Sequence, residues 1–472
     1  FQHAINGETI GSCSSKGLDY KHILRYGREK GSTALRKMTF QQRGEMLKSL
    51  ALYLHKRKDQ FYQLSTATGA TKIDSWIDIE GGIGNLFANA SLRRQFPDLP
   101  YHVDGQAAPL SKNGTFIGHH IMVPRRGVAI HINAFNFPIW GMLEKIAVNF
   151  MAGVAAVVKP SEYTSFLTTA MVKEIIKSGI LPKGSLQIIP GLGRGILDHV
   201  DHRDVVTFTG SAATGKILKS HPNILAHSVP FNMEADSLNA CVLGKDAVPG
   251  TAEFDLFVKE VHKEMTVKTG QKCTASSRLI VHENIYKNFV KGLLESIKNL
   301  KVGHALDEGT QMGPASNQSQ FESNLNYIEV GKREAKLAFG GNPMNMRTPG
   351  YYMEPTLFID GDNKSRINQE EMFGPIACVI PAKNLDHALE IANATDFGLS
   401  SGIITNSLAK AEYFKQNIKT GVTTINLPTA GLDYHVPFGG RKASSFGPRE
   451  QGTYARDFYS QVKTSYINSG SV

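Results

Sequence analysis

The apolar residues of this 472-residue chain first follow the period of helices and later alternate between two patterns. In residues 36–64 they repeat at helical spacing (Leu47, Leu50, Leu54 and Phe61), which predicts that the chain opens with helices. From residue 128, short apolar runs alternate with helical patterns. The predicted order is Val128–Ile132 (strand), Phe137–Met151 (helix), Val154–Val158 (strand), Ser165–Lys177 (helix), Leu186–Pro190 (strand), Val205–Thr209 (strand) and a helix at Thr214. Such alternation is typical of a parallel sheet with helices on both faces.

A second alternation predicts a second α/β unit. It begins with Ser277–His282 (strand) and Ile285–Leu300 (helix) and continues through Ile376–Ile380, Leu385–Ala392, Ser400–Thr405 and Leu408–Gln416. Residues 104–124 are predicted to form a hairpin that turns at Lys112-Asn113-Gly114. The chain is therefore expected to be an α/β protein of two domains with a β hairpin, and its length suits that division.

Polar and glycine-rich segments follow several of these strands. Asn136, Lys159, Gly191-Leu192-Gly193 and Gly210-Ser211 each come just after a predicted strand. Ligands bind beyond the carboxyl ends of parallel strands, so these positions predict a site at one edge of the sheet. The run from Gly210 to Gly215 opens a helix with small residues, which would let a pyrophosphate approach the helix N-terminus, although it differs from the usual G-x-G-x-x-G fingerprint.

Composition narrows the function classes. The longest apolar run, Ile146–Val158, is far too short for a membrane span, and no signal pattern opens the chain, so a cytoplasmic location is expected. The net charge is +10, from 52 basic and 42 acidic residues, but the basic residues are dispersed without a stacking-aromatic pattern. Nucleic acid is therefore not an expected partner, whereas an anionic substrate or cofactor fits the charge.

The cysteines indicate thiol chemistry rather than a disulfide framework or a metal site. Cys13, Cys241, Cys273 and Cys378 are scattered with no C-x-x-C pair. Cys273 lies in Gly270-Gln271-Lys272-Cys273-Thr274-Ala275, which suits a structural core poorly and leaves room for an approaching molecule. Lys272 is expected to place a cation beside the sulfur, and this would favour the thiolate of a group whose ordinary pKa is about 8.5.

Two polar residues elsewhere match the needs of a cysteine nucleophile. Glu234 lies where a strand gives way to a loop and would activate water to release a covalent intermediate, but a lone Glu, like the nearby Asp236, is more often a solvated residue. Asn136 lies at the mouth of a helix, where its amide would donate to an oxyanion; a helix cap is the commoner role for such a residue.

Together these motifs resemble the aldehyde dehydrogenase superfamily. The matching segments are Asn136-Phe137-Pro138, Lys159-Pro160-Ser161-Glu162, Phe208-Thr209-Gly210-Ser211 with Gly215, Glu234, Gly270-Gln271-Lys272-Cys273, Glu371-Met372-Phe373-Gly374-Pro375 and Pro437-Phe438-Gly439-Gly440. They run over nearly the whole chain in the family's order. The resemblance implies a Rossmann-like dinucleotide-binding domain (residues 1–103 and 125–236), an α/β catalytic domain (237–447) and oligomerisation strands (104–124 and 456–472) of a homodimer or higher homo-oligomer.

The resemblance also implies a reaction, the NAD- or NADP-dependent oxidation of an aldehyde through a cysteine thioester. Cys273 would be the nucleophile, Asn136 an oxyanion donor and Glu234 the base for water, with no metal ion. Lys159 and Glu162 would meet the adenosine ribose and Ser211, with Gly210 and Gly215, the pyrophosphate. Glu371 would bind the nicotinamide ribose, and Phe373 would pack beside it.

One bacterial subgroup resembles the chain further. Residues 234–239, 131–138, 140–145, 74–82 and 265–268 are similar to the dehydrogenase half of the bifunctional ring-opening protein of phenylacetate degradation and to related enzymes of aerobic benzoyl-CoA breakdown. Those enzymes oxidise semialdehydes carried on coenzyme A, generally with NADP. The tail from residue 437 to 467 instead resembles ordinary aldehyde dehydrogenases. Glu162 would suit the ribose hydroxyls of NAD and repel a 2′-phosphate, so both cofactors stay open.

Three alternatives accompany this interpretation. The first is a broad-specificity dehydrogenase of free aldehydes. The second is a CoA-acylating dehydrogenase, which the presence of Glu234 argues against, because such enzymes typically lack this base. The third is a catalytically idle structural protein on the same fold, which the retention of Cys273, Glu234 and Asn136 argues against.

Overall fold

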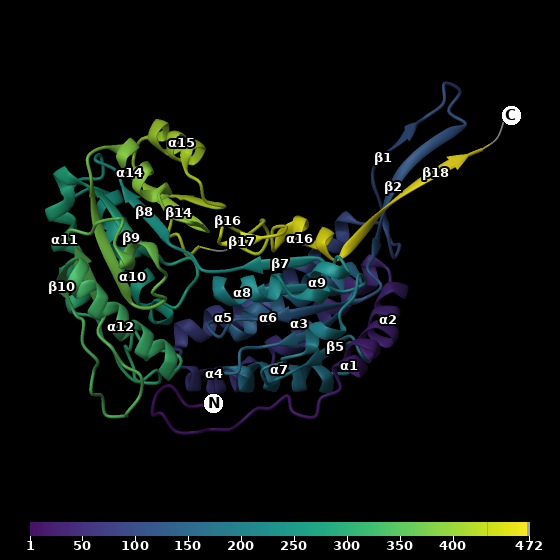
Figure 1. The fold of residues 1–472 in the computed structure, drawn as a ribbon, viewed down its shortest axis with the longest axis horizontal. Coiled ribbons are helices and arrows are strands. Elements are labelled where there is room, and N and C mark those ends of the chain that lie inside the picture. Colours follow the sequence, from purple (N-terminus) through teal and green to yellow (C-terminus); the bar gives the residue numbers. More distant parts are fainter. Residues whose placement is uncertain (432, 470–472) are drawn as a thin grey trace.

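Two predominantly parallel sheets, each covered by helices, lie side by side in the computed structural model, which describes residues 1–431 and 433–469 (Figure 1). The first sheet has the strand order β17-β7-β6-β3-β4-β5 and is parallel except for β17. Its strands are β3 (Val128–Ile132), β4 (Ala155–Lys159), β5 (Leu186–Ile188), β6 (Val205–Thr209), β7 (Phe231–Glu234) and β17 (Ser445–Phe446). Their apolar side chains are buried on both faces, as expected for a parallel sheet.

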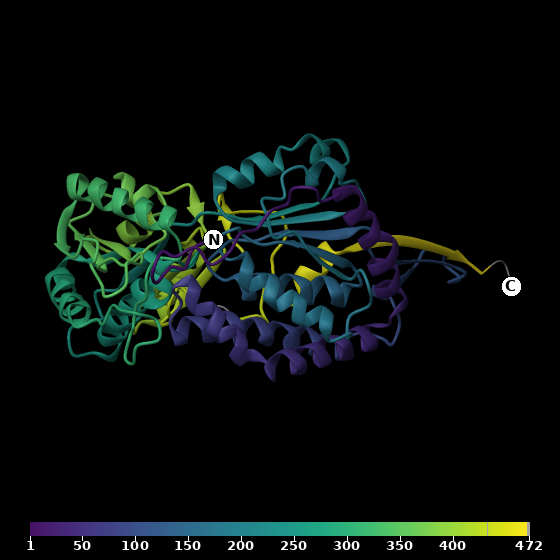
Figure 2. The ribbon, with the colours of Figure 1, turned by 90° about the horizontal axis from the view of Figure 1, so that it is seen from below.

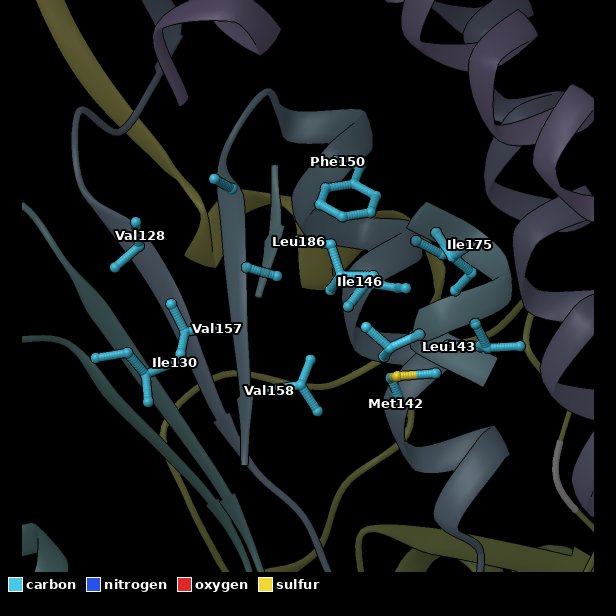
Figure 3. Packing of buried hydrophobic residues seen from close by; sticks show 14 of the residues in the cluster. Val128, Ile130, Met142, Leu143, Ile146, Phe150, Val157, Val158, Ile175 and Leu186 are labelled. Atoms are coloured by element: carbon cyan, nitrogen blue, oxygen red, sulfur yellow. The ribbon is translucent and has the colours of Figure 1, made fainter. Parts of the chain in front are cut away.

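Helices before and within this sheet supply its cover. They are α1 (Tyr20–Tyr26), α2 (Ser32–Lys37), α3 (Phe40–His55), α4 (Lys58–Ser65), α5 (Lys72–Leu92), α6 (Pro138–Ala152), α7 (Ser165–Lys177), α8 (Ala212–Lys219) and α9 (Pro222–Ala226). Figure 3 shows α6 packing Met142, Leu143, Ile146 and Phe150 toward the side chains of β3 and β4. All four are fully buried, so the helix is fixed firmly against the sheet.

The second sheet has the order β10-β11-β12-β9-β8-β14-β15 and is parallel except for β10. Its strands are β8 (Asn239–Leu243), β9 (Ser276–His282), β10 (Lys336–Phe339), β11 (Thr356–Ile359), β12 (Ile376–Ala382), β14 (Ser400–Ile404) and β15 (Val422–Ile425). The accompanying helices are α10 (Ala252–Thr266), α11 (Glu283–Lys298), α12 (Gln318–Glu334), α13 (Arg366–Gln369), α14 (Leu385–Asn393) and α15 (Leu408–Asn417). A short antiparallel ladder joins β13 (Phe397–Gly398), which precedes β14, to β16 (Arg441–Lys442), which follows β15. Helix α16 (Gly452–Phe458) follows β17.

A third, three-stranded sheet forms an arm that extends away from both lobes (Figures 1 and 2). It contains β1 (His102–Pro109), β2 (Phe116–Pro124) and β18 (Ser460–Asn468), with β2 in the centre and antiparallel to both neighbours. The predicted hairpin and its pairing with the C-terminal strand are thus confirmed. Residues 470–472 of the predicted oligomerisation segment lie outside the described residues.

The α/β fold predicted from the sequence is confirmed, and most elements differ from their predicted bounds by one or two residues. The domain boundaries stay a prediction. The parallel strands of the first sheet all lie within residues 125–236 and those of the second within 237–447, but β17 crosses this division by pairing with β7. Within the described residues, no helix is both long enough and apolar enough to cross a membrane.

Candidate active site

Cys273 lies in a tightly held loop between α10 and β9. A 3-10 turn over Val267–Gly270 precedes it, in which Lys268 and Thr269 have left-handed backbones with φ of 58° and 54°. Such backbones persist in residues with a Cβ only where the surroundings hold them. Gly270 is also left-handed, and a Cβ there would lie 2.2 Å from the carbonyl oxygen of Gly374. The chain in front of the cysteine therefore has little freedom.

The cysteine itself is half-buried and faces carboxyl groups. Its carbonyl oxygen accepts a hydrogen bond from Nδ2 of Asn239 at 2.8 Å, which fixes the backbone. Burial and three nearby carboxylates (Glu234, Glu371 and Glu144) raise the pKa of the Cys273 thiol well above its usual range. The thiol is consequently protonated at rest and must lose its proton as it attacks a substrate.

The side chain of Lys272 points toward α10 and not toward the thiol, so the prediction that its charge favours the thiolate is wrong. Its side chain is buried, and its Nζ lies 3.5 Å from the carbonyl oxygen of Lys263 in α10. Burial lowers the pKa of Lys272 to about 8, while the charges of Glu264 and Asp74 oppose that shift. Adjacent side chains leave the backbone in different directions, so a neighbour in sequence is here not the electrostatic neighbour in space.

Glu234 is the last residue of β7, at the predicted end of a strand, and only 5 % of it is exposed. Its Oε1 accepts from Oγ of Ser445 at 2.8 Å, whereas Oε2 has no hydrogen-bond partner among the described residues. Burial and the charge of Glu450 raise the pKa of Glu234 to about 8. A carboxyl with a free oxygen and such a pKa is suited to accept a proton near neutral pH.

Asn136 lies between β3 and α6 and reaches toward the cysteine loop. Its Nδ2 donates to the carbonyl oxygen of Gln271 at 3.0 Å, two residues before Cys273. The first turn of α6 has Phe137 as its N-cap residue, with no side-chain capping bond. The helix-cap interpretation of Asn136 is therefore wrong. Since an amide nitrogen carries two hydrogens, the second N–H remains for another acceptor.

A buried ionic cluster adjoins Glu234, and the sequence analysis gave its members no role. Nζ of Lys145 in α6 donates to both carboxylate oxygens of Glu450 at 2.8 Å and lies 3.5 Å from Glu144. Glu144 in turn accepts from Nε2 of Gln451 at 2.7 Å. Two adjacent charged residues, Glu144 and Lys145, in the mostly apolar helix α6 were the available signal. Its partner Glu450 lies 305 residues further along the chain.

The predicted adenosine-binding residues lie at the carboxyl edge of the first sheet. Lys159 ends β4, and its Nζ pairs with Oε2 of Glu162 at 3.2 Å, with 40 % of the Glu162 side chain exposed. Ser211 is exposed and caps α8 by accepting from the backbone N–H of Thr214. Gly193 lies against Lys159, where a Cβ would come within 3.0 Å of its Cγ. These groups line one edge, as predicted.

Gly210 and Gly215 serve the packing of α8, and their close approach to a pyrophosphate stays a prediction. A Cβ on Gly210 would lie 2.6 Å from the ring of Phe208, and one on Gly215 would lie 2.4 Å from Sδ of Met233. Both glycines therefore let the start of α8 pack directly on β6 and β7. This packing places the helix terminus close to the sheet edge, where an anion would bind.

Glu371 and Phe373 lie in the loop that leads into β12. Oε1 of Glu371 accepts from the backbone N–H of Ser237 at 3.0 Å and from its Oγ at 3.1 Å, and this hydroxyl also contacts the carbonyl oxygen of Cys273. Burial, with the charge of Asp236, raises the pKa of Glu371 to about 8. Phe373 has φ of 53°. Its ring packs edge to face with that of Phe135, with 5.7 Å between the two ring centroids. Glu371 is thus tied to the nucleophile loop.

The edge between the adjacent strands β3 and β6 carries polar groups that fit a dinucleotide. Asn133 follows β3, and both atoms of its side-chain amide are buried without a hydrogen-bond partner in the described part of the chain; the same holds for Oγ1 of Thr209 at the end of β6. Dinucleotides bind at this edge of such sheets. With Lys159, Glu162 and the start of α8 beside them, the residues present suit a nucleotide cofactor.

The chain belongs to the aldehyde dehydrogenase family, whose sequence model matches residues 2–465. It is 35 % identical to the 3,4-dehydroadipyl-CoA semialdehyde dehydrogenase of Aromatoleum evansii over 413 residues, covering 86 % of this chain and 80 % of that protein. Over 445 residues it is 32 % identical to the alpha-ketoglutaric semialdehyde dehydrogenase of Bacillus subtilis, covering 92 % and 87 %. The structure of betaine aldehyde dehydrogenase from Staphylococcus aureus in complex with NAD+ superposes with a TM-score of 0.90 at 26 % identity, covering 100 % and 91 %.

The family resemblance and the fold predicted from the sequence are therefore confirmed. The protein is an aldehyde dehydrogenase, an oxidoreductase that acts on the aldehyde group. The cofactor predicted as NAD or NADP is also confirmed at that level, since several solved relatives are complexes with NAD+.

Proposed function

We propose that this protein oxidises a CoA-linked semialdehyde to the carboxylic acid through a thioester on Cys273, with Asn136 and Glu234 as its catalytic partners. The observation that carries the proposal is their convergence from three separate segments. Asn136 bonds to the backbone two residues before the cysteine, and Glu234 lies close enough to raise the pKa of the Cys273 thiol. Nucleophile, oxyanion donor and base are thus gathered at one point.

Attack begins with the loss of the thiol proton. Because Cys273 is half-exposed, this proton leaves to water as the sulfur attacks, and Glu234 stays free for the later hydrolysis. The sulfur then bonds to the aldehyde carbon, and the oxygen becomes an oxyanion. The free N–H of the Asn136 amide and the backbone N–H of Cys273 stabilise it by donating hydrogen bonds.

Bound NAD(P)+ supplies the acceptor for the hydride that leaves the substrate carbon, which turns the thiohemiacetal into a thioester. Lys159 and Glu162 would hold its adenosine ribose, Ser211 at the start of α8 its pyrophosphate, and Glu371 the nicotinamide ribose. Phe373 would pack beside that ribose. These assignments rest on the position of each residue along the sheet edge and on the polar groups left unpaired there.

Water completes the reaction by attacking the thioester, and Glu234 takes its proton. The carboxylic acid leaves, and the Cys273 thiol is restored. The charges of Glu450 and Lys145 act on the pKa of this base in opposite directions. Glu450 raises the pKa of Glu234, whereas Lys145 lowers it. Neutralising the Glu450 carboxylate would therefore make Glu234 more acidic and a weaker base.

The charge around the thiol favours a neutral aldehyde end on the substrate. Glu234, Glu371 and Glu144 all act on the Cys273 thiol, so a small semialdehyde would bring its own carboxylate into a buried site that already holds three carboxyl groups. A CoA thioester carries its charges on a distant nucleotide and presents an uncharged chain to the thiol. The similarity to a CoA-linked semialdehyde dehydrogenase supports the same substrate class.

Two further parts of the proposal concern assembly and location. We expect a homodimer or higher homo-oligomer, because the arm exposes apolar side chains along β1 and β18, among them Val103, Val462, Tyr466 and Ile467. We expect a cytoplasmic location, because the reaction needs a reduced thiol and all four cysteines are free.

Steady-state turnover tests the substrate class when three substrates share one carbon chain and differ at the far end. These are a six-carbon semialdehyde as its CoA thioester, the same semialdehyde as its free acid, and hexanal, each with NAD+ and with NADP+. We expect kcat/KM to be at least tenfold higher for the CoA thioester than for the free acid. Equal or higher kcat/KM for hexanal would favour the broad-specificity dehydrogenase, and formation of an acyl-CoA at the aldehyde end would favour the CoA-acylating class.

A further inference from the structure

Helix α5 carries two buried aspartates one turn apart, Asp74 and Asp78, at the back of the candidate active site. Residues four apart lie on the same face of a helix. Asp74 is 2 % exposed and Asp78 is fully buried, and among the described residues neither forms an ion pair at contact distance, although the charge of Lys268 acts on Asp78 and that of Asp74 on Lys272. Buried carboxylates without a direct ion pair need hydrogen bonds to compensate their lost hydration.

Asp78 accepts hydrogen bonds from the start of α6. Its Oδ1 accepts from the backbone N–H of Ile139 at 3.1 Å and from that of Trp140 at 2.8 Å. Helix α6 lacks a cap of its own, because its N-cap residue Phe137 makes no capping bond and Pro138 has no N–H to donate. A carboxylate from a neighbouring helix thus satisfies the free N–H groups and the positive end of the helix dipole. Asn136 directly precedes this anchored turn.

Asp74 holds the other side of the site. Its Oδ1 accepts from the backbone N–H of Lys268 at 2.7 Å, and its Oδ2 accepts from that of Thr71 at 2.9 Å. Lys268 is the first of the left-handed residues that lead to Cys273. The hydrogen bond that Asp74 accepts therefore fixes the loop at a residue whose left-handed backbone needs support from its surroundings. Directly after the turn, the carbonyl oxygen of Gln271 accepts from Asn136.

Close packing between α5 and α6 makes this arrangement rigid. A Cβ on Gly81 would lie 2.1 Å from the ring of Trp140, and one on Gly82 would lie 3.1 Å from the Cα of Trp140. The two helices therefore approach each other at the turn that Asp78 caps. This explains the segment from Asp74 to Gly82, which stood out in the sequence without a function.

We propose that Asp74 and Asp78 are positioning residues that fix the two halves of the oxyanion site to one helix, Asp78 through the first turn of α6 and Asn136, and Asp74 through Lys268 and the cysteine loop. This rests on the proposed roles of Asn136 and Cys273. Neither aspartate contacts the substrate or the cofactor. Both act by keeping the amide of Asn136 and the thiol at their mutual distance, where displacement by about 1 Å is enough to cost about 100-fold in rate.

A double-mutant cycle tests the half that depends on Asp78. Asp78→Ala is expected to lower kcat about 10- to 100-fold with little change in the KM of the aldehyde or in cofactor binding, and Asp78→Asn is expected to recover most of the loss, because its amide oxygen accepts the same two N–H groups. In an Asn136→Ala background, Asp78→Ala should cost less than about twofold, since residues that act as one unit are not additive. Additive losses would overturn the proposal, as would a wild-type kcat for Asp78→Ala.

Thiol reactivity tests the half that depends on Asp74. In Asp74→Ala the loop loses its anchor, so the rate of Cys273 alkylation by iodoacetamide should rise several-fold while kcat falls, and Asp74→Asn should restore both. The matched control is Glu80→Ala on the same helix, whose carboxylate pairs with Lys58 and Tyr62 away from the thiol. Unchanged alkylation and kcat in a folded Asp74→Ala protein would overturn this half.

The same variants separate this inference from the proposed function. If Asn136→Ala alone keeps a wild-type kcat, Asn136 is not the oxyanion donor and the proposed function fails at that residue. If Asn136→Ala loses activity but the cycle with Asp78→Ala is additive, the proposed function stands and the positioning role fails. Near-ultraviolet circular dichroism and Tm of each variant establish that the losses occur in folded protein.

Discussion

The thiol end and the adenosine end of the candidate active site differ in how deeply their side chains are buried. At the thiol end, Cys273, Glu234 and Glu371 are buried or half-buried, and burial together with nearby carboxylates raises the pKa of all three. At the adenosine end, the Lys159–Glu162 pair is partly open, with 40 % of the Glu162 side chain exposed, and Ser211 is exposed. With the proposed assignments, chemistry would take place in a fixed, poorly hydrated setting, whereas the cofactor would be met by groups that water screens.

This difference determines what substitutions should do. A buried group has few alternatives, so its replacement changes the rate by orders of magnitude and leaves the neighbours unsatisfied. An exposed ion pair contributes little by itself, so its replacement shifts a preference without abolishing activity. Substitutions at the thiol end should therefore abolish activity, whereas substitutions at the adenosine end should only shift a preference.

The largest effect is expected from Cys273→Ala, which removes the atom that forms the thioester. Dehydrogenase activity should vanish, while NAD(P)+ binding, followed by quenching of protein fluorescence, and Tm stay near wild type. Cys13→Ala is the matched control, because Cys13 is also partly exposed but lies beside Leu192 and Arg194 rather than in the cysteine loop. Turnover by Cys273→Ala at a sizeable fraction of wild type would remove this residue as the nucleophile.

A smaller but still large effect is expected from Glu234→Gln, because a carboxamide does not take a proton from water. Deacylation should slow by about 100-fold or more, whereas hydride transfer is spared, so rapid mixing should show a burst of NAD(P)H and intact mass an acyl-enzyme. In the wild type, deacylation should rise with pH and level off above about 8, since Glu234 is a base only when ionised. The variant should lose this pH dependence.

Loss of the burst itself would show that Glu234 is needed before hydride transfer, to take the thiol proton, and that another group then activates water. The matched control is Glu370→Gln, which makes the same exchange in an exposed carboxylate paired with Arg366. It should keep both the burst and the steady-state rate.

Much of the fold, and the main candidate site residues, could be predicted from the sequence, because both have local signals. Periodicity placed the strands, and the chemistry of strand ends pointed to Asn136, Lys159 and Glu234. Lys272 shows where such reasoning fails: it is next to Cys273 in sequence, but its Nζ faces the backbone of α10. The direction in which a loop side chain points depends on tertiary contacts, which residue spacing in the sequence does not reveal.

Residues that act through distant partners were also beyond prediction. Glu450 joins Lys145 across 305 positions, and Asp74 reaches Lys268 across 194. Each is unremarkable in its own segment, where an Asp or Glu usually indicates a solvated surface. Only folding brings them into the interior, and that is where their charge matters.

The smallest effect is expected at the adenosine end, from Glu162→Thr. If Glu162 faces the ribose, two negative charges at about 4 Å would cost on the order of 4 kcal/mol at an effective dielectric of 20 when NADP brings its 2′-phosphate. Exposure and the pairing with Lys159 reduce this to about 1 kcal/mol, so the substitution should raise the ratio of kcat/KM for NADP over NAD about fivefold. Glu329→Thr is the matched control, because Glu329 forms the same kind of i,i+3 pair with Lys332 in α12. An unchanged ratio in Glu162→Thr would mean that this carboxylate does not reach the ribose and that cofactor choice is made elsewhere along the sheet edge.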